Sequence, residues 1–149
     1  MRLTQLTDYA MRLLIHVAQH PERLCTTAEV AARYGISETH LVKVTHQLGR
    51  AGWLATTRGK GGGIRLARPP QEIGIGAVVR SIEPDFSVVE CFSTGNSCQL
   101  TGTCKLTGVM DGALHSFMTF LDSHSLADIL PDAADAPRPI RVQRRAKAA

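Results

Sequence analysis

Three cysteines, Cys91, Cys98 and Cys104, lie close together in the second half of the chain. Cysteine thiolates are the usual ligands of iron–sulfur clusters. The glycine, serine and asparagine residues between them favour a flexible loop that can gather the three thiols around one metal centre. Three thiolates are one ligand short of the usual four. The spacing therefore predicts a metal site that is open, or one completed by a ligand from elsewhere in the chain or from a second chain.

The overall composition is typical of a globular protein in a reducing compartment. The 149 residues are 44% hydrophobic and 20% charged, which suits one domain of ordinary size. No apolar run has the length of a transmembrane helix and no signal peptide opens the sequence, so we expect a cytoplasmic protein without a membrane partner. In that compartment, clustered cysteines favour metal binding or redox chemistry over structural disulfides.

Charge divides the chain into three parts. Residues 1–70 hold ten Lys and Arg against four Asp and Glu, a balance of +6. Residues 71–130 hold two against seven, giving −5, and residues 131–149 hold five against two, giving +3. The first part is therefore a candidate for binding a polyanion, although a solvated basic face is the alternative, and the acidic part must have a different task.

Helical periodicity and capping signals predict three helices in the basic segment. Apolar residues recur at helical spacing over residues 4–19. Thr26 and Glu29 have the spacing of a capping box, which would open a short helix that stops at Gly35. Ser37 is expected to cap a third helix. The inner side of this third helix would carry Leu41, Val42, Val44 and Leu48.

A hairpin is predicted directly after these helices. The tight connection between the second and third helices is typical of a helix-turn-helix. Residues 53–58 and 64–67 have the pattern of two strands, and the glycine-rich stretch 59–63 between them indicates a turn. A hairpin that follows a helix-turn-helix is the layout of a winged helix.

A long helix is predicted over residues 104–121, directly after the last cysteine. Its broad apolar face needs a partner; we expect the same helix of a second copy, and packing on the first helix of its own chain is the alternative. One last turn of helix is expected over 125–130. The expected fold is thus mainly α with a small β-hairpin wing. It comprises a winged helix-turn-helix DNA-binding domain over 1–70, a cluster-binding loop and dimerisation helix over 71–130, and a basic disordered tail over 131–149.

The basic segment offers side chains that suit double-stranded DNA. In a helix-turn-helix, the first residues of the second helix reach base edges in the major groove, and the remaining basic side chains can contact phosphates. The candidate DNA-binding residues are Arg2, Arg12, Ser37, Glu38, Thr39, His40, Lys43, Arg58, Lys60 and Arg65. The glycine run lacks the spacing of a nucleotide-binding P-loop, and no helix follows it. No set of residues indicates a substrate pocket, so we do not expect an enzyme.

With these residues in view, the chain resembles the iron–sulfur transcription regulators of the NsrR/IscR/RirA family. The resemblance covers about residues 1–130. It rests on the opening residues, the wing sequence, the cysteine spacing before a long helix, and the stretches 75–80 and 125–130. It implies a homodimeric repressor that binds a palindromic operator and carries an iron–sulfur cluster, 4Fe–4S or alternatively 2Fe–2S.

The resemblance also bears on the missing fourth ligand. The IscR branch is known for a histidine three residues after its last cysteine, where this chain has Thr107. The NsrR branch has an aspartate at the position of Asp8, and there it is a cluster ligand donated by the partner subunit. The resemblance thus implies a cluster held by Cys91, Cys98, Cys104 and a second chain's Asp8, which senses nitric oxide and releases the operator on nitrosylation. Without the resemblance, Asp8 is an ordinary residue of a helix's first turn.

Other interpretations stay open from the sequence. A regulator of iron or cluster status in the same family is the alternative function. A small electron-transfer protein, or a zinc site in which a His or Asp completes the three cysteines, would also explain the thiols. His115 and His124 are further candidate ligands, and Cys25 is expected to be a thiol without a role.

Overall fold

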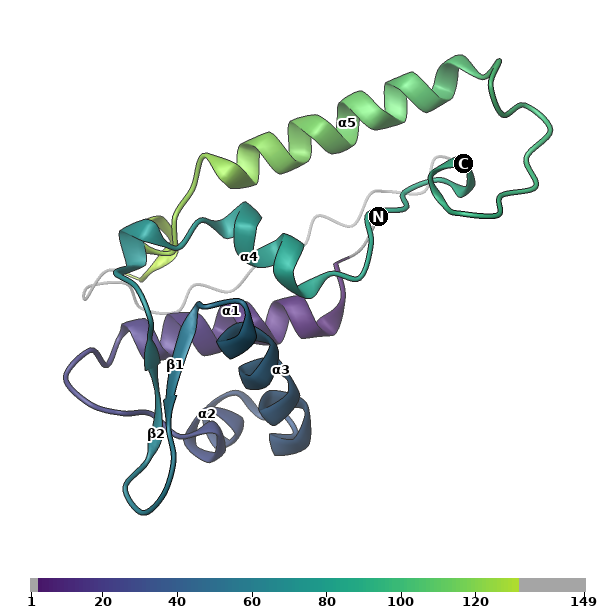
Figure 1. The fold of residues 1–149 in the computed structure, drawn as a ribbon. Coiled ribbons are helices and arrows are strands. Elements are labelled where there is room, and N and C mark those ends of the chain that lie inside the picture. The colour runs from purple at the N-terminus through teal and green to yellow at the C-terminus, as the bar shows by residue number, and fades with distance from the viewer. Residues whose placement is uncertain (1–2, 132–149) are drawn as a thin grey trace, which may run out of the picture.

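Three helices and a hairpin form the basic N-terminal part of the chain. The computed structural model describes residues 3–131. The elements of this part are α1 (Gln5–Ala18), α2 (Thr27–Tyr34), α3 (Glu38–Arg50), β1 (Leu54–Thr57) and β2 (Gly63–Leu66). The two strands are antiparallel, with Leu54 opposite Leu66 and Thr57 opposite Gly63, and they project from the helices as a wing (Figure 1). The predicted winged helix-turn-helix is confirmed.

Local signals account for the boundaries of α2. The Thr26 hydroxyl accepts a hydrogen bond from the backbone N–H of Glu29 at 3.1 Å, as a capping box requires. Gly35 ends the helix in the left-handed conformation, with φ of 63°, which glycine adopts without steric cost. Ser37 lies at the predicted N-cap of α3, but its side chain makes no capping hydrogen bond. The expected capping interaction of Ser37 is therefore wrong.

The acidic part of the chain contains a short helix and a long one. Its elements are the 3-10 turns η1 (Pro70–Glu72), η2 (Glu90–Phe92) and η3 (Ala127–Ile129) and the helices α4 (Ile75–Ile82) and α5 (Lys105–Asp122). In Figure 1, α5 forms an arm beside α4. The last turn expected over 125–130 is η3, where the backbone N–H and hydroxyl of Ser125 donate to Asp128 Oδ2 at 2.7 and 2.8 Å. Apart from Pro131, the tail expected over 131–149 lies outside the described residues.

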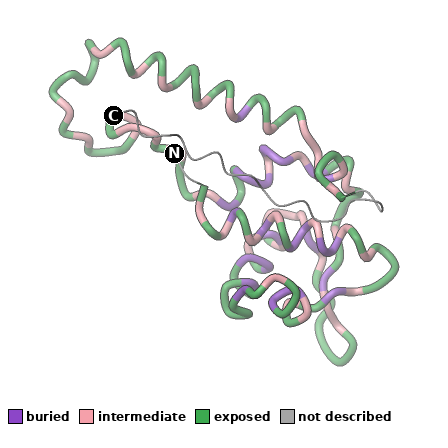
Figure 2. The backbone as a smooth tube through the Cα atoms, turned by 180° about the vertical axis from the view of Figure 1, so that it is seen from behind, coloured by how far each residue is buried: buried purple, intermediate pink, exposed green. Residues whose placement is uncertain are grey.

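One hydrophobic core joins the two parts of the chain. Buried side chains of α1, α2, α3 and the wing pack together with Ile73, Val78, Ile82 and Leu126. Figure 2 shows the buried residues concentrated in this body, whereas the arm is mainly exposed or half-buried. The core therefore crosses residue 70, where the charge changes sign, so the segment before the cysteine loop is packed on the three N-terminal helices.

The apolar face of α5 is only partly covered. Leu114, Phe117, Met118 and Leu121 pack with Ile75 and Val79 of α4. The apolar side chains that remain largely exposed on α5 are Leu106 (57%), Val109 (65%) and Phe120 (66%). In the described part of the chain, no helix has the length and apolar character needed to cross a bilayer. The long helix thus packs on its own chain along one side and leaves further apolar surface uncovered.

Candidate cluster site and nucleic-acid interface

The three cysteines lie on the loop that leads into the arm. Cys91 belongs to η2, Cys98 follows in the irregular loop, and Cys104 is the N-cap residue of α5. All three are half-buried free thiols. Two glycines, Gly95 and Gly102, turn the loop in the left-handed region, with φ of 80° and 90°. The loop thus leaves its thiols accessible at the start of the long helix.

Cys91 and Cys104 share Thr107 as a neighbour. The Cys91 Sγ atom lies 3.5 Å from Thr107 Oγ1. Hydrogen bonds from the backbone N–H groups of Leu106 and Thr107 lower the pKa of the Cys104 thiol, and the Thr107 side chain adds to this. The N-terminus of a helix favours a thiolate because its unpaired N–H groups point at the negative charge. The first turn of α5 therefore favours the thiolate form of Cys104.

Glu90 holds the loop in shape. Its carboxylate accepts hydrogen bonds from the Ser97 backbone N–H at 3.1 Å and the Ser97 hydroxyl at 3.0 Å. These bonds lower the pKa of Glu90. They close the segment between Cys91 and Cys98, so Glu90 positions both cysteines. Sequence reasoning missed this residue because only the folded loop brings Glu90 and Ser97 together.

The candidate fourth ligands lie elsewhere. Asp8 is in the first turn of α1, half-exposed, and pairs with Arg12 at 2.8 Å. His115 is eleven residues beyond Cys104, which corresponds to about 16 Å along the helix. His124 Nδ1 lies 2.8 Å from the Phe120 carbonyl oxygen at the far end of the arm. Neither histidine can therefore complete the site of its own loop, and Asp8 stays a prediction.

Glu83 connects the helix of Asp8 to the stem of the cysteine loop. It follows α4, and its Oε1 atom accepts hydrogen bonds from the Thr4 backbone N–H at 2.8 Å, the Thr4 hydroxyl at 3.1 Å and the Thr7 hydroxyl at 2.5 Å. A carboxylate is favoured at this place because the N-terminus of a helix carries partial positive charge. The start of α1 is thus capped from the segment that precedes the loop.

The outer face of α3 presents the predicted base-reading residues. Ser37, Glu38, Thr39, His40 and Lys43 are all exposed. Val42, which we expected on the inner side, is 53% exposed, and that expectation is wrong. The buried side consists of Leu41, Val44, Thr45 and Leu48. Val42 therefore lies on the outer surface with Thr39 and Lys43, where an apolar side chain can contact a thymine methyl group.

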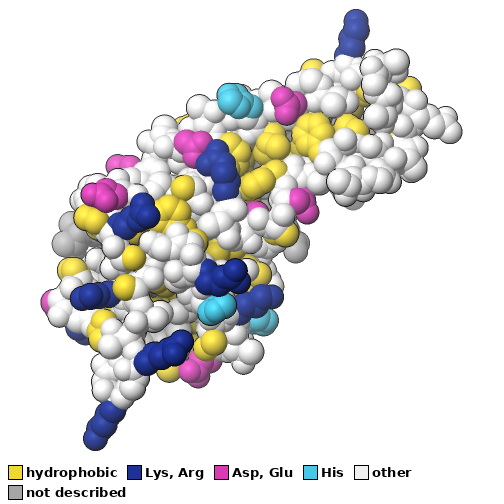
Figure 3. Space-filling view, viewed as in Figure 1, with side chains coloured by type: hydrophobic (Ala, Val, Ile, Leu, Met, Phe, Trp, Pro, Cys, Tyr) yellow, Lys and Arg dark blue, Asp and Glu magenta, His cyan; other side chains and the backbone are white. Residues whose placement is uncertain are grey.

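The wing carries the predicted phosphate-binding side chains. Arg58, Lys60 and Arg65 are exposed, and Gly59 and Gly61 form the tip with φ of 95° and 78°. Figure 3 shows Lys and Arg side chains spread over the body and the wing tip. Of the other two predicted DNA contacts, Arg12 is paired with Asp8. Arg2 lies outside the described residues.

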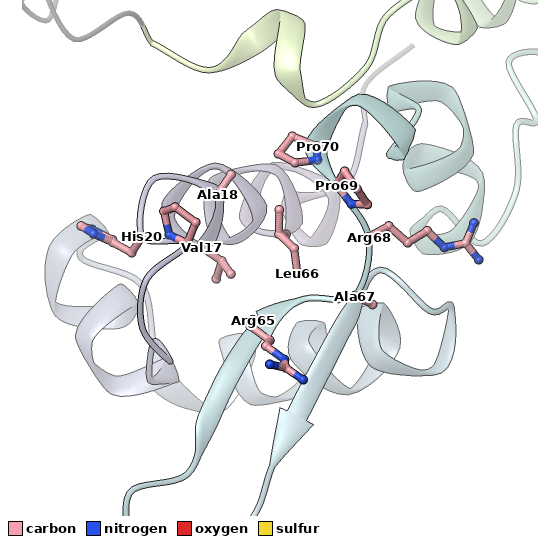
Figure 4. Close-up of a pocket in the computed structure, with 10 residues that line it drawn as sticks. Val17, Ala18, His20, Arg65, Leu66, Ala67, Arg68, Pro69 and Pro70 are labelled. Atoms are coloured by element: carbon pink, nitrogen blue, oxygen red, sulfur yellow. The ribbon is translucent and has the colours of Figure 1, made fainter.

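A cavity of about 360 Å³ lies between the end of α1 and the segment that leaves the wing (Figure 4). Its lining consists of Val17, Ala18, His20, Pro21, Arg65, Leu66, Ala67, Arg68, Pro69 and Pro70. This lining contains no carboxylate, thiol or hydroxyl side chain. The Arg68 guanidinium lies 5.5 Å from the centre of the Trp53 ring. The cavity therefore lacks the pair of nucleophile and base that a hydrolytic site needs.

Comparison with known proteins agrees with this arrangement. The model of the family Rrf2, described as "Iron-dependent Transcriptional regulator", matches residues 3–132. The HTH-type transcriptional regulator NsrR of Geobacillus kaustophilus (strain HTA426) is 46% identical over 136 residues, which cover 90% of this chain and 92% of that protein. NsrR of Bacillus subtilis (strain 168) is 40% identical over 145 residues, which cover 96% and 99%. Among solved structures, T. potens IscR matches with a TM-score of 0.71 at 28% identity and covers 93% and 94% of the two chains.

Proposed function

Since this chain belongs to the Rrf2 family of transcriptional regulators, we propose that it is a homodimeric repressor whose iron–sulfur cluster senses nitric oxide. In this proposal the dimer binds a palindromic DNA operator and releases it when nitric oxide reaches the cluster. The observation that carries the proposal is the convergence of Cys91 and Cys104 on Thr107, on an accessible loop at the start of the arm. As a transcriptional regulator, the protein is not an enzyme.

The donor set of the loop fits an iron–sulfur cluster. Three accessible cysteines are available, and the helix N-terminus lowers the pKa of Cys104 so that it deprotonates readily. We assign Cys91, Cys98 and Cys104 as ligands of a 4Fe–4S cluster. When bound, this group supplies iron atoms that react with nitric oxide, while the loop's half-exposed position admits the gas.

We assign the fourth ligand to Asp8 of the partner subunit. Asp8 is half-exposed on α1, and exchanging Arg12 for a new partner costs little because surface ion pairs are weak. Asp8 would then connect each α1 to the cysteine loop of the other subunit. Glu83 connects the same helix to the segment that precedes the loop of its own subunit. Because α3 packs on α1, freeing Asp8 lets the two recognition helices move. Their separation must match half-sites about one DNA turn apart, so this movement weakens operator binding.

The second copy is expected to cover the exposed apolar side chains of α5, including Val109 and Leu106. A buried charge without a partner is strongly unfavourable in such an interface, so Val109→Asp should give monomers in sedimentation experiments. Asp111→Asn is the control, because Asp111 lies about 200° around the helix from Val109. A dimer that persists in both Val109→Asp and Leu106→Asp would refute this interface.

The decisive experiment follows operator binding during addition of nitric oxide. The probe is a DNA duplex that the anaerobic holoprotein selects from a random-sequence pool. We expect binding to fall in step with the visible cluster spectrum as nitric oxide is added. Binding that survives saturating nitric oxide overturns nitric-oxide sensing.

A second candidate function is the sensing of iron or cluster status. The observation that favours it is the family description, which names iron dependence. In that case an iron chelator should abolish binding of the selected duplex, whereas nitric oxide should leave it unchanged.

Substitution of Asp8 tests the ligand assignment directly. Asp8→Ala should change the cluster spectrum and its response to nitric oxide, as should Cys98→Ala. Glu72→Ala removes an exposed carboxylate from η1 and serves as the control. If Asp8→Ala keeps the wild-type spectrum and sensitivity, the partner-subunit ligand is excluded.

A further inference from the structure

A second set of metal-binding side chains lies in the body of the protein, apart from the cysteine loop. His16, Cys25 and Glu29 each offer one ligand atom, and these atoms all lie within 4.8 Å of one another. His16 is in α1, Cys25 is in the connection after it, and Glu29 is in the first turn of α2. We infer that these three side chains bind a single divalent cation of the zinc type. No role in the proposed nitric-oxide response involves them.

Cys25 is held rigidly at the centre of this group. The thiol is completely buried. Its backbone pairs with the wing: Cys25 N–H donates to the Ile64 carbonyl at 2.9 Å, and Ile64 N–H donates to the Cys25 carbonyl at 2.8 Å. Gly63 permits this pairing, because a Cβ atom there would collide with the Cys25 carbonyl oxygen. The sulfur is therefore a preorganised ligand rather than a thiol on a mobile loop.

The donor atoms select the class of cation. One sulfur, one imidazole nitrogen and one carboxylate oxygen form a set that zinc accepts, whereas magnesium and calcium prefer oxygen ligands alone. A tetrahedral zinc separates its ligand atoms by about 3.5 Å, given its bond lengths. His16 Nε2 and Glu29 Oε1 already lie 3.1 Å apart, and the widest separation, at most 4.8 Å, must close by up to about 1.3 Å. The Glu29 side chain is 31% exposed and is the member with room to move.

Without a metal ion, the Glu29 carboxylate pairs with the Arg23 guanidinium, a cation that a metal ion can replace. Glu29 Oε1 lies 3.1 Å from His16 Nε2 and 2.8 Å from Arg23 NH1. The Arg23 side chain is 43% exposed, so it can turn into solvent when a metal ion takes over the carboxylate. Burial raises the pKa of Cys25. Metal binding releases the thiol proton of Cys25 and requires His16 to carry its proton on Nδ1.

The bound cation would link three segments that support the DNA-binding surface. α1 and α2 both pack against α3, and the backbone of Cys25 is paired with the wing. A ligand that binds only the folded chain stabilises it. The metal is therefore expected to raise the thermal midpoint of unfolding, independently of the iron–sulfur cluster.

The test uses the full chain with Cys91, Cys98 and Cys104 changed to Ser, so that Cys25 is the one remaining thiol of the four. Titration with Co²⁺ reports thiolate coordination through a charge-transfer band. We expect one equivalent to bind, to be displaced by Zn²⁺, and to raise the thermal midpoint. The band should vanish on adding Cys25→Ser, and His16→Gln or Glu29→Gln should weaken binding more than about tenfold.

Two controls separate this site from adventitious binding. His115→Ala removes an exposed histidine and Glu72→Gln an exposed carboxylate, and neither should change the titration. Circular dichroism establishes that each variant is folded, and if Cys25→Ser is not, the His16 and Glu29 variants decide the matter. Absence of a thiolate band, or a band unaffected by His16→Gln and Glu29→Gln, would overturn the site. Metal analysis of the wild-type holoprotein grown with zinc should show one zinc ion beside the iron.

Discussion

The Arg80 guanidinium donates two hydrogen bonds to Asp122, each 2.6 Å long and each to a different carboxylate oxygen. Arg80 is on α4 in the body, and Asp122 is the last residue of α5. Such two-pronged pairs restrict geometry as well as adding energy. This pair helps to set the direction in which the arm, and the cysteine loop at its other end, leave the DNA-binding body.

Acid should remove the contribution of this pair. The hydrogen bond from Arg80 lowers the pKa of Asp122 below its ordinary value of 3.8. A lowered pKa in the folded state stabilises the protein above pH 3.8, and the stabilisation is lost as the pH falls through the folded-state pKa. We predict that Asp122→Asn lowers the thermal midpoint at pH 7, and that the difference from wild type shrinks below pH 3.8. For Asp111→Asn, which changes an exposed carboxylate on the same helix, the difference should stay near zero at both pH values.

Substitution of Gly76 should disturb the contact between Arg80 and Asp122. Gly76 is buried in α4, and a Cβ atom there would collide with the Asp122 carboxylate. Gly76→Ala is expected to displace the exposed Asp122 carboxylate and to lower the free energy of unfolding by up to about 1 kcal/mol, the value of an exposed ion pair. The control is Gly49→Ala in α3, where a Cβ atom meets nothing closer than 3.9 Å. Denaturant unfolding should show Gly49→Ala to be neutral or slightly stabilising, because alanine favours helices. Equal losses in both variants would contradict this explanation.

The thiols should differ in their reactivity. Hydrogen bonds from the N–H groups of Leu106 and Thr107 lower the pKa of Cys104, whereas burial raises the pKa of Cys25. Because the thiolate is the reactive form, we predict that apoprotein Cys104 is alkylated at a lower pH than a free cysteine, and that Cys25 stays unmodified until the protein unfolds. Peptide mass spectrometry after iodoacetamide treatment measures both. Thr107→Val keeps the backbone N–H and removes the hydroxyl, so it should move the alkylation of Cys104 slightly to a higher pH, and no movement would exclude a contribution of the Thr107 hydroxyl.

The wing should contribute binding energy that does not depend on sequence. Lys60 is exposed at the glycine-rich tip, where a lysine suits a phosphate contact. Lys60→Ala is expected to weaken binding to all DNA duplexes by a similar factor. It should also reduce the slope of log affinity against log salt by about one. Lys60→Arg keeps the charge and should keep the slope. A loss confined to the selected duplex would instead assign Lys60 to base recognition.

Much of the fold follows from local sequence signals. The Thr26–Glu29 capping box and Gly35 mark α2, and the glycine-rich stretch 59–63 marks the wing turn, because caps and left-handed turns depend on a few neighbouring residues. The prediction for Val42 was wrong because its burial depends on tertiary packing and not on a local signal. Leu41 and Val42 are adjacent apolar residues, and only the orientation of α3 against α1 decides which of them is buried.

The order of elements predicted a winged helix-turn-helix and the cysteine spacing predicted a metal-binding loop, whereas the regulator function was implied by the resemblance to a known family. Contacts between distant segments were not readable in this way, because each depends on how whole helices pack. Tertiary structure alone placed Glu83 over the start of α1, Asp122 beside Arg80, and Thr107 between two cysteines. It also turned Cys25, an isolated residue in the sequence, into the neighbour of His16 and Glu29. Three segments that are separate along the chain meet there because the wing, α1 and α2 share one core.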